Sequence, residues 1–600
     1  MTGLWRRRLP RFIVLVLALA LASAACTSND GDADTTTPTT TAAPDTTTTT
    51  VAPETTTTTQ PKPLKAYGGE AIVADDDEPE TLNPMAPGGH TFIVSIIGQG
   101  YLTGIQEIDG FTLDLVPELA TELPTAANGG VVVNDDLTMT VTYTIKDEAV
   151  WADGVPITGT DFEFTYETIM DPAIPVLKDT YQDIIPESIV VGDKTFEYTL
   201  AAPTVQHELL FGTIIPKHAV EGSDFVGDWN ETMWISGGPF MFDKWVKGEY
   251  IELVRNDNYW KVDRETDQQL PYLDNVIFEF IPETDALLTA FEEREVDIIQ
   301  PASNPETIET LKALEPAGAQ VEVLAGPTWE HFNFQFGDGR FERNEKSCNE
   351  SLAMRQAVGH AIDKELLVDE LIGGYVDPLG SYVDVFTPSL SQRAWEQYDY
   401  DPEKAGELYA EAVVETGREC EVVFTATSNI EARVQLAELL IDMFGAAGIP
   451  YRNQLEDSQL FYGETLDNGS WDTSVWAWVG YPGLRALVGV TDLWDPEADP
   501  PPNGQNYYRY GTSAEGAYTD EATARLAAAR DEMNATVDSE ELAVLIQEVE
   551  NIFAVNAVFH PLYARPVTAA VWADEIGGFK HNPTQAGYTW NIEDWYRVDG

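Results

Sequence analysis

Apolar and polar residues alternate in short runs through the first half of the chain. In residues 138–145, Met139, Val141, Tyr143 and Ile145 fall on one face, and threonines fall on the other. Alternation of period two predicts a half-buried antiparallel strand. Residues 195–200 alternate in the same way. Between these strands, Thr160 or Asp161 is placed to cap a helix over 162–169, which the sequence Asp-Pro at 171–172 ends.

In the second half, apolar residues recur at helical spacing instead. The predicted helices cover 352–372 (after a capping box at 347–350 and closed by two glycines), 402 to about 414, 430–447, 520–534 and 539–555. Strands are predicted near 421–426 and 472–479. The order is mixed α/β without regular βαβ repetition, and no internal repeat is visible.

The N-terminus carries an export signal. Four arginines between residues 6 and 11 precede an apolar run over 12–22, and Ser23, Ala24 and Ala25 lead into Cys26. Residues 1–25 are therefore predicted to be a signal peptide. Its apolar run is too short for a comfortable membrane span.

Residues 26–67 are predicted to be a disordered tether, because 16 of the 25 residues from 35 to 59 are Thr and offer no apolar surface to offset chain entropy. A signal, a cysteine at the cut and a spacer together resemble a bacterial lipoprotein with Cys26 carrying the lipid. This implies an extracytoplasmic protein, anchored to the outer face of the cytoplasmic membrane or periplasmic. The alternative is plain secretion with an incidental cysteine, since Ser23 stands where lipoproteins usually carry Leu.

Composition narrows the class of protein. The residues after the tether are too many for one hydrophobic core, so two or three lobes are expected. With 34 basic and 101 acidic residues, the formal net charge is −67. This acidic excess argues against binding to nucleic acid and against docking on anionic lipid through a basic patch. The acidic residues indicate either a strongly solvated surface, as in a saline habitat, or a cation-selective cleft.

Two cysteines remain after Cys26. In an oxidising compartment, Cys348 and Cys420 are a possible disulfide, which their separation of 72 residues neither supports nor forbids. Seven scattered histidines and these two cysteines give no metal-site spacing, so no metal and no cofactor are predicted.

Ten short motifs, in order, resemble one family. They are ETLNP at 80–84, PELA at 117–120, AVWADG at 149–154, GGPF at 237–240, LVRNDNYW at 253–260, YLD at 272–274, EVD at 295–297, FN at 332–333, MRQAVGHAID at 354–363 and DPEKA at 401–405. This order resembles the extracytoplasmic solute-binding proteins of the oligopeptide, dipeptide and nickel type (family 5), which serve ABC importers. The resemblance covers roughly residues 68–600.

The resemblance implies an α/β fold with two lobes around a cleft, like periplasmic binding proteins of type II, cluster C, with an additional inserted domain. It places lobe I at 68–110, 233–322 and 559–600, the inserted domain II at 111–232, and lobe III at 323–558. Hinge closure over a trapped solute is the implied motion.

The resemblance also places a ligand site near residues 471–494. Peptide-binding relatives carry an Asp there, a few residues after a Trp, which holds the peptide amino terminus. This chain lacks that Asp, and Asp472, Asp492 and Asp495 are the nearby substitutes. The candidate ligand contacts are mostly aromatic rings that can stack on a solute or hold a cation: Trp151 (core or cleft), Trp329, Asn333, Trp476, Ala477, Trp478, Tyr481, Trp494 and Tyr507.

The implied function is capture of a peptide-like or other small polar or oligomeric solute, delivered by a monomer to an ABC permease and its ATPase subunits. One alternative is a surface sensor that reports a solute without transporting it. The other is a secreted hydrolase, for which the sequence offers no nucleophile elbow, no zinc-protease motif and no selected carboxylate pair. The solute itself, whether peptide, sugar, cationic metabolite or metal chelate, is not fixed by the sequence.

Overall fold

The computed structural model describes residues 63–598, except residues 90, 177, 338–347, 482, 502–504 and 512–519. The predicted signal peptide, Cys26 and nearly all of the predicted tether lie outside the described residues. Within the described part of the chain, no helix has both the length and the apolar character that a membrane crossing requires.

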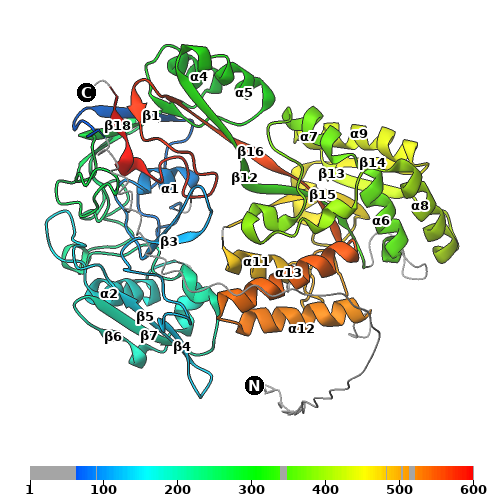
Figure 1. Cartoon of the computed structure of the whole chain (residues 1–600), viewed down its shortest axis with the longest axis horizontal. Helices are drawn as coiled ribbons and strands as arrows, with labels where there is room; N and C mark the ends of the chain where they lie inside the picture. The colour runs from blue at the N-terminus through cyan, green and yellow to red at the C-terminus, as the bar shows by residue number, and fades with distance from the viewer. Residues whose placement is uncertain are drawn as a thin grey trace, which may run out of the picture. The chain divides into compact units, whose positions relative to one another are not determined.

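A ten-stranded sheet runs through most of the described chain, in the order β14-β13-β15-β12-β16-β11-β1-β10-β9-β8 (Figure 1). Its strands are β1 (Glu70–Asp75), β8 (Phe240–Val246), β9 (Tyr250–Arg255), β10 (Asn275–Phe280), β11 (Ile298–Ile299), β12 (Ala319–Phe334), β13 (Val422–Thr427), β14 (Tyr451–Glu456), β15 (Thr473–Val479) and β16 (Phe559–Trp572). We call the part around β1 and β8–β11 the first lobe, and the part around β13–β15 the second lobe.

The long strands β12 and β16 belong to both lobes. They pair in antiparallel fashion from Ala319 opposite Trp572 to Asn333 opposite Phe559. At one end β16 also pairs with β11 of the first lobe, and at the other end β12 pairs with β15 of the second lobe. Figure 1 shows the two strands running side by side between the lobes. The two lobes are therefore joined by one pair of shared strands.

A smaller antiparallel sheet, β4-β5-β7-β6, has its own core, and we call residues 105–214 around it the inserted region. The smaller sheets contain β2 (Gln106–Ile108), β3 (Leu115–Pro117), β4 (Val131–Val133), β5 (Met139–Thr144), β6 (Val190–Val191), β7 (Thr195–Leu200), β17 (Ile576–Gly577) and β18 (Tyr596–Arg597). Side chains from Ile215 to Trp234 pack in the first-lobe core instead. The domain limits expected from the family resemblance stay predictions.

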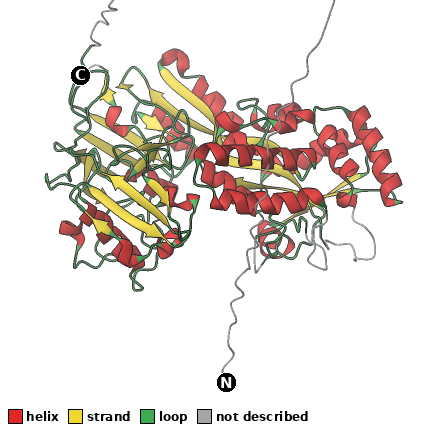
Figure 2. Cartoon of the chain, turned by 60° about the horizontal axis from the view of Figure 1, so that its bottom comes forward, coloured by secondary structure: helices red, strands yellow, loops and turns green. Residues whose placement is uncertain are grey.

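Helices dominate the second lobe, on the right in Figures 1 and 2, whereas strands and loops make up most of the rest. The helices are α1 (Phe92–Gly98), α2 (Gly159–Met170), α3 (Lys217–Val220), α4 (Thr284–Glu292), α5 (Pro305–Lys312), α6 (Leu352–Ala361), α7 (Lys364–Ile372), α8 (Pro402–Thr416), α9 (Glu431–Ala446), α10 (Ser458–Leu460), α11 (Leu484–Asp492), α12 (Glu521–Ala535) and α13 (Ser539–Val555).

Most predicted elements are present, with three local differences. The helix expected over 352–372 is two helices, because the backbone extends after Ala361 and the Asp363 side chain caps α7 by accepting from the Leu366 N–H (3.0 Å). Ser351 caps α6, in place of the box expected at 347–350. Thr158 caps α2, with Asp161 completing the capping box. Strands β5 and β7 and helix α13 agree with their predictions to within a residue.

Lys261 joins the inserted region to the first lobe. Its ammonium contacts Glu107 (3.4 Å), Glu593 (3.2 Å) and Glu118. Burial opposes the charge of Lys261, but the carboxylates outweigh it and raise the pKa of the ammonium above its usual range. Burial also raises the pKa of Glu107 and of Glu593 to about 7, although Lys261 favours their charged forms.

The Cys348–Cys420 disulfide, with Cα atoms 5.8 Å apart, closes a loop across a sequence separation of 72 residues and links the start of α6 to β13. We expect the double variant Cys348→Ala/Cys420→Ala to unfold more easily by about 2–4 kcal/mol, because its unfolded chain is no longer constrained. Urea denaturation measures this difference. Reduction of the wild type should reproduce the loss, and a reductant should leave the double variant unchanged. Equal stability of oxidised and reduced wild type would contradict the prediction.

The Glu593 carboxyl gives a pH prediction. The folded state holds its proton up to about pH 7, whereas the unfolded chain releases it near pH 4.5. Its contribution to stability is therefore complete below pH 4.5 and is lost as the pH rises through 7. We expect Glu593→Gln to reduce the fall in unfolding free energy between about pH 5 and about pH 8 by on the order of 2 kcal/mol.

The matched control is Glu541→Gln, which changes an exposed glutamate on α13. Urea denaturation at a series of pH values compares the three proteins. A Glu593→Gln profile parallel to that of the wild type is the outcome that counts against this role of the buried carboxyl.

Candidate functional site

A cavity of about 580 Å³, which we call the main cavity, lies at the meeting point of the three parts of the fold. Helix α1 and the segment 585–593 supply first-lobe walls, while β2 and β3 supply the wall of the inserted region. Tyr481, in the loop that follows β15, is the only described lining residue that comes from the second lobe. The main cavity therefore has lining residues from all three parts of the fold.

Carboxylates outnumber cations in the main cavity. Glu107, Glu118, Glu593 and Lys261 all line it, and Lys261 is the only Lys or Arg among the described lining residues. Glu107 and Glu593 lose their protons only above about pH 7, and one ammonium group cannot neutralise three carboxylates once they have done so. The electrostatic field there favours a ligand that carries positive charge.

Aromatic rings line the same cavity. Tyr481 is 56 % exposed, and Phe92 and Trp590 contribute rings from the first lobe. The Trp590 indole is held in place, because its Nε1 donates to the Lys580 carbonyl (2.9 Å). Such rings offer flat apolar surface for a solute, beside the polar groups that orient it.

Trp478 on β15 is positioned by a part-buried hydrogen bond. Its Nε1 donates to the Tyr508 hydroxyl (2.9 Å), which also lies 3.2 Å from His331 Nε2. The Trp478 ring is half-buried, with the ring of Tyr507 5.8 Å away between centroids. Ala477 is half-buried on the same strand as Trp478. None of the three candidates Ala477, Trp478 and Tyr507 is among the described residues that line the main cavity.

Five of the predicted ligand contacts lie in the core. Trp494 stacks between Tyr508 and Phe559 (4.4 and 4.2 Å between centroids), and Trp476 stacks on the other side of Tyr508 (5.2 Å). The same burial applies to three further side chains, Trp151, Trp329 and Asn333. These side chains pack in the core, none of the five is among the described residues that line the main cavity, and as ligand contacts they stay predictions.

The three aspartates expected to replace the missing family aspartate are also committed elsewhere. Asp492 and Asp495 both pair with Arg530, at 2.7 and 3.3 Å. Asp472 is buried and accepts from the Asn349 amide (3.2 Å). None of the three is among the described residues that line the main cavity.

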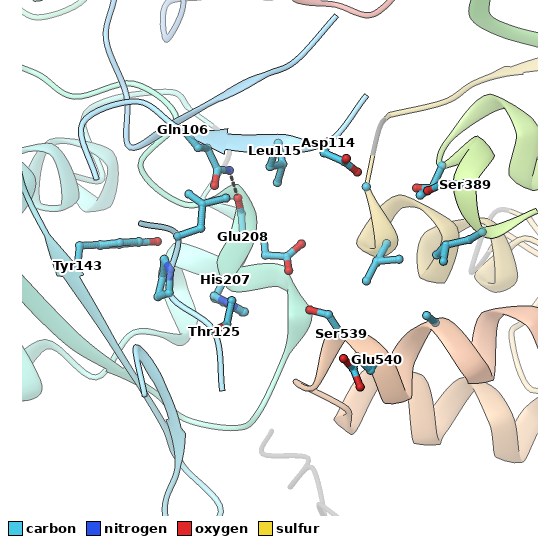
Figure 3. A pocket seen from close by; sticks show the side chains of 17 residues that line it. Gln106, Asp114, Leu115, Thr125, Tyr143, His207, Glu208, Ser389, Ser539 and Glu540 are labelled. Atoms are coloured by element: carbon cyan, nitrogen blue, oxygen red, sulfur yellow. Dashed lines mark hydrogen bonds between the residues drawn. The ribbon is translucent and has the colours of Figure 1, made fainter. Parts of the chain in front are cut away.

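A second cavity, of about 430 Å³, lies between the inserted region and the second lobe (Figure 3). Gln106 and Leu115 line both cavities, so the two are adjacent. Gln106 is fixed here through its side-chain amide, which donates to the Glu208 carbonyl. Within the described part of the chain, no group of His, Cys, Asp and Glu side chains is arranged to hold a metal ion.

Sequence reasoning found Tyr481 but missed most of the cavity walls. The missed residues come from segments near 92–118, 207–213, 259–261 and 585–593, which only the fold brings together. No local pattern marks them. The one available signal was Lys261, a rare cation in a strongly acidic chain.

Comparison with known proteins agrees with this architecture. Residues 114–485 match the sequence model of the bacterial extracellular solute-binding proteins, family 5 middle. The oligopeptide-binding protein AppA of Bacillus subtilis is 22% identical over 559 residues, which are 88% of this chain and 92% of that protein. A probable ABC transporter-binding protein of Deinococcus radiodurans is 22% identical over 55% of this chain, and the match spans 57% of that relative.

Solved structures show the same fold. The ABC transporter substrate-binding protein CtaP of Listeria monocytogenes superposes with a TM-score of 0.68, at 22% identity, over 89% of this chain and all of that one. The periplasmic EDTA-binding protein EppA gives 0.67 at 20% identity, over 89% of this chain and 98% of that one. Both support the two-lobed fold of periplasmic binding proteins. Because the family model covers more than half of its residues, the chain belongs to the family 5 bacterial extracellular solute-binding proteins.

Proposed function

We propose that this protein captures a peptide-like or other small polar solute in the main cavity by closure of the two lobes, and delivers it to an ABC importer. The observation that carries this proposal is the position of Tyr481, which reaches the cavity from the second lobe while its other walls belong to the first lobe and the inserted region. A solute between them contacts both sides, so it stabilises the closed arrangement.

The carboxylates of the main cavity support recognition of an amino group. Glu107, Glu118 and Glu593 share a single cation, Lys261, so a solute amino group can pair with them in place of the family aspartate that this chain lacks. A hydrogen bond between an ammonium group and a carboxylate contributes roughly 1.5–3 kcal/mol. Two relatives from Bacillus subtilis, AppA and OppA, are named as oligopeptide-binding proteins, which is consistent with such a ligand.

Export and anchoring complete the proposal. The signal peptide, Cys26 and the Thr-rich spacer suit a lipid-anchored monomer that reorients on a flexible tether to meet its permease. The partners are then the solute, the permease with its ATPase subunits, and the membrane through the lipid.

The Tyr481 ring gives the first test. We expect Tyr481→Ala to weaken the binding of a short peptide about tenfold, since an aromatic contact of this kind contributes on the order of 1–2 kcal/mol. Isothermal titration with alanine-based peptides of two to six residues measures the change. Tyr400→Ala, which removes an exposed tyrosine of the second lobe outside the cavity, is the matched control. Equal affinities for the two variants would place the solute elsewhere, and no binding by the wild type would overturn a peptide-like solute.

The anchor gives the second test. We expect Cys26→Ser to move the protein from the membrane fraction to the soluble exported fraction, because the thiol that carries the lipid is gone. Immunoblots of fractionated cells measure the distribution, and Thr27→Ala, at the next residue along the chain, is the control. A wild-type protein that is already soluble and exported would show plain secretion.

A further inference from the structure

We propose that the second cavity is a subsite for a cationic group on an aliphatic chain, a primary ammonium or a guanidinium, which Glu208 and Thr387 hold. This inference rests on the proposed solute-binding function and adds a recognition site beside the main cavity. Because Gln106 and Leu115 line both cavities, a solute that fills the main cavity can extend one side chain into the second.

The charges around the second cavity select the sign of its ligand. Asp114, Glu208 and Glu540 line it, and no Lys or Arg is among its described lining residues. Figure 3 shows the Glu208 carboxylate pointing away from its own backbone, toward the side on which Ser539 and Ser389 lie. This carboxylate has no hydrogen bond or ion pair with any described residue. A cation would therefore meet acceptors without displacing an existing ion pair.

Thr387 is an independent indication of a ligand. This residue lines the cavity from the second lobe and is 5 % exposed, yet its Oγ1 has no hydrogen-bond partner among the described residues. Buried polar atoms in native proteins are nearly always paired. The Oγ1 atom is itself shielded from solvent here, so a donor in the cavity reaches it once the Thr387 side chain turns, and an ammonium or guanidinium group supplies such donors.

The remaining walls suit a chain of methylene groups. Leu115 and Leu123 line the cavity from the inserted region, and Leu390, Leu484 and Ala543 line it from the second lobe. Apolar walls with a few placed polar acceptors favour a cation at the end of an aliphatic chain over a small hydrated ion.

The electrostatics of Glu208 adds a pH dependence. Burial raises the pKa of its carboxyl to about 7, although Arg485 on α11 lowers it. Four other titratable groups face this region: His207 on the same turn, Tyr143 of β5, Asp114 and Glu540. Burial lowers the pKa of His207 and raises the pKa of Tyr143, so both side chains are neutral at about pH 7. Arg485 itself donates to Gln206 Oε1 (2.5 Å). A bound cation favours the ionised carboxyl, so binding should strengthen from about pH 6 to about pH 8.

The direct test uses n-butylammonium and n-butanol, which share an aliphatic chain and differ in charge. In saturation-transfer NMR on the full exported chain at about 150 mM NaCl, we expect n-butylammonium to bind at least about tenfold more tightly than n-butanol. Glu208→Gln should abolish this preference, and Thr387→Val, which keeps the shape of the side chain, should weaken it. Glu187→Gln removes one exposed charge from the inserted region outside the cavity and should change nothing.

Thermal unfolding first establishes that each variant is folded. If Glu208→Gln fails this check, the subsite is tested by the preference for n-butylammonium in Thr387→Val, and by that preference in the wild type at pH 6 and at pH 8. The inference is overturned if the wild type shows no preference for n-butylammonium, if the preference survives Glu208→Gln in a folded protein, or if Glu187→Gln removes it equally.

A second experiment separates this inference from the proposed function. Alanine-based peptides of two to six residues with a single lysine are compared with the same peptides carrying norleucine, which lacks only the ammonium group. We expect the wild type to prefer the lysine peptides about tenfold and Glu208→Gln to lose that preference. Binding of both sets with equal affinity keeps the proposed function and overturns the subsite. Binding of n-butylammonium without any peptide binding overturns the peptide-like solute and keeps the subsite.

Discussion

The pairing of β12 with β16 is the constraint on which the rest of the structure depends. One antiparallel ladder joins the two lobes, which together with the inserted region line the two cavities. The ladder is interrupted between Ala325, which is opposite Pro566, and Trp329, which is opposite Ala564; Pro566 has no N–H to donate. Gly326 lies in this interruption, and a Cβ atom there would come within 2.7 Å of the Arg565 carbonyl. The regular pairing of the shared strands is therefore broken at this point.

The scarcity of cations explains how the cavities acquire their charge. With 34 basic residues against 101 acidic ones, cations are scarce, and three that are buried or half-buried pair with particular carboxylates. Arg433 and Glu330 form a buried pair in the second lobe, Arg597 holds Asp297 in the first, and Lys261 is shared by three glutamates at the junction with the inserted region. Because burying an unpaired charge is costly, these cations are committed to the fold. The carboxylates that line the cavities therefore outnumber the cations there, and a cationic solute can neutralise the excess negative charge.

Local patterns predicted the secondary structure well, because alternation and helical spacing are properties of short segments. Strand β7 and helix α13 follow directly from their own residues. The break between α6 and α7 was missed, since apolar spacing continues across Ile362 and Asp363 and only the cap at Asp363 ends the pattern. The site was harder to predict for a different reason. A tryptophan suits a core and a cleft equally well, and the stacking of Trp476 and Trp494 on Tyr508 depends on contacts between distant segments. Tyr481 was identified because the family resemblance places a ligand site near residues 471–494, where its ring is one of several aromatic candidates.

The two cavities also bear on how closure is controlled. The second cavity is lined from one side by the inserted region and from the other by the second lobe, so its two walls belong to parts of the fold that meet there. The bond between Arg485 and Gln206 joins the same two parts beside it. A ligand group in this cavity contacts both the inserted region and the second lobe, so it favours the arrangement in which these two parts are close. The size of this effect is the difference in its interaction free energy between the open and closed states. A solute that fills only the main cavity lacks that contribution. In the proposed subsite, recognition of the solute and stability of the closed state then depend on the same carboxylate, that of Glu208. A solute that this carboxylate recognises is therefore also the one that dissociates more slowly.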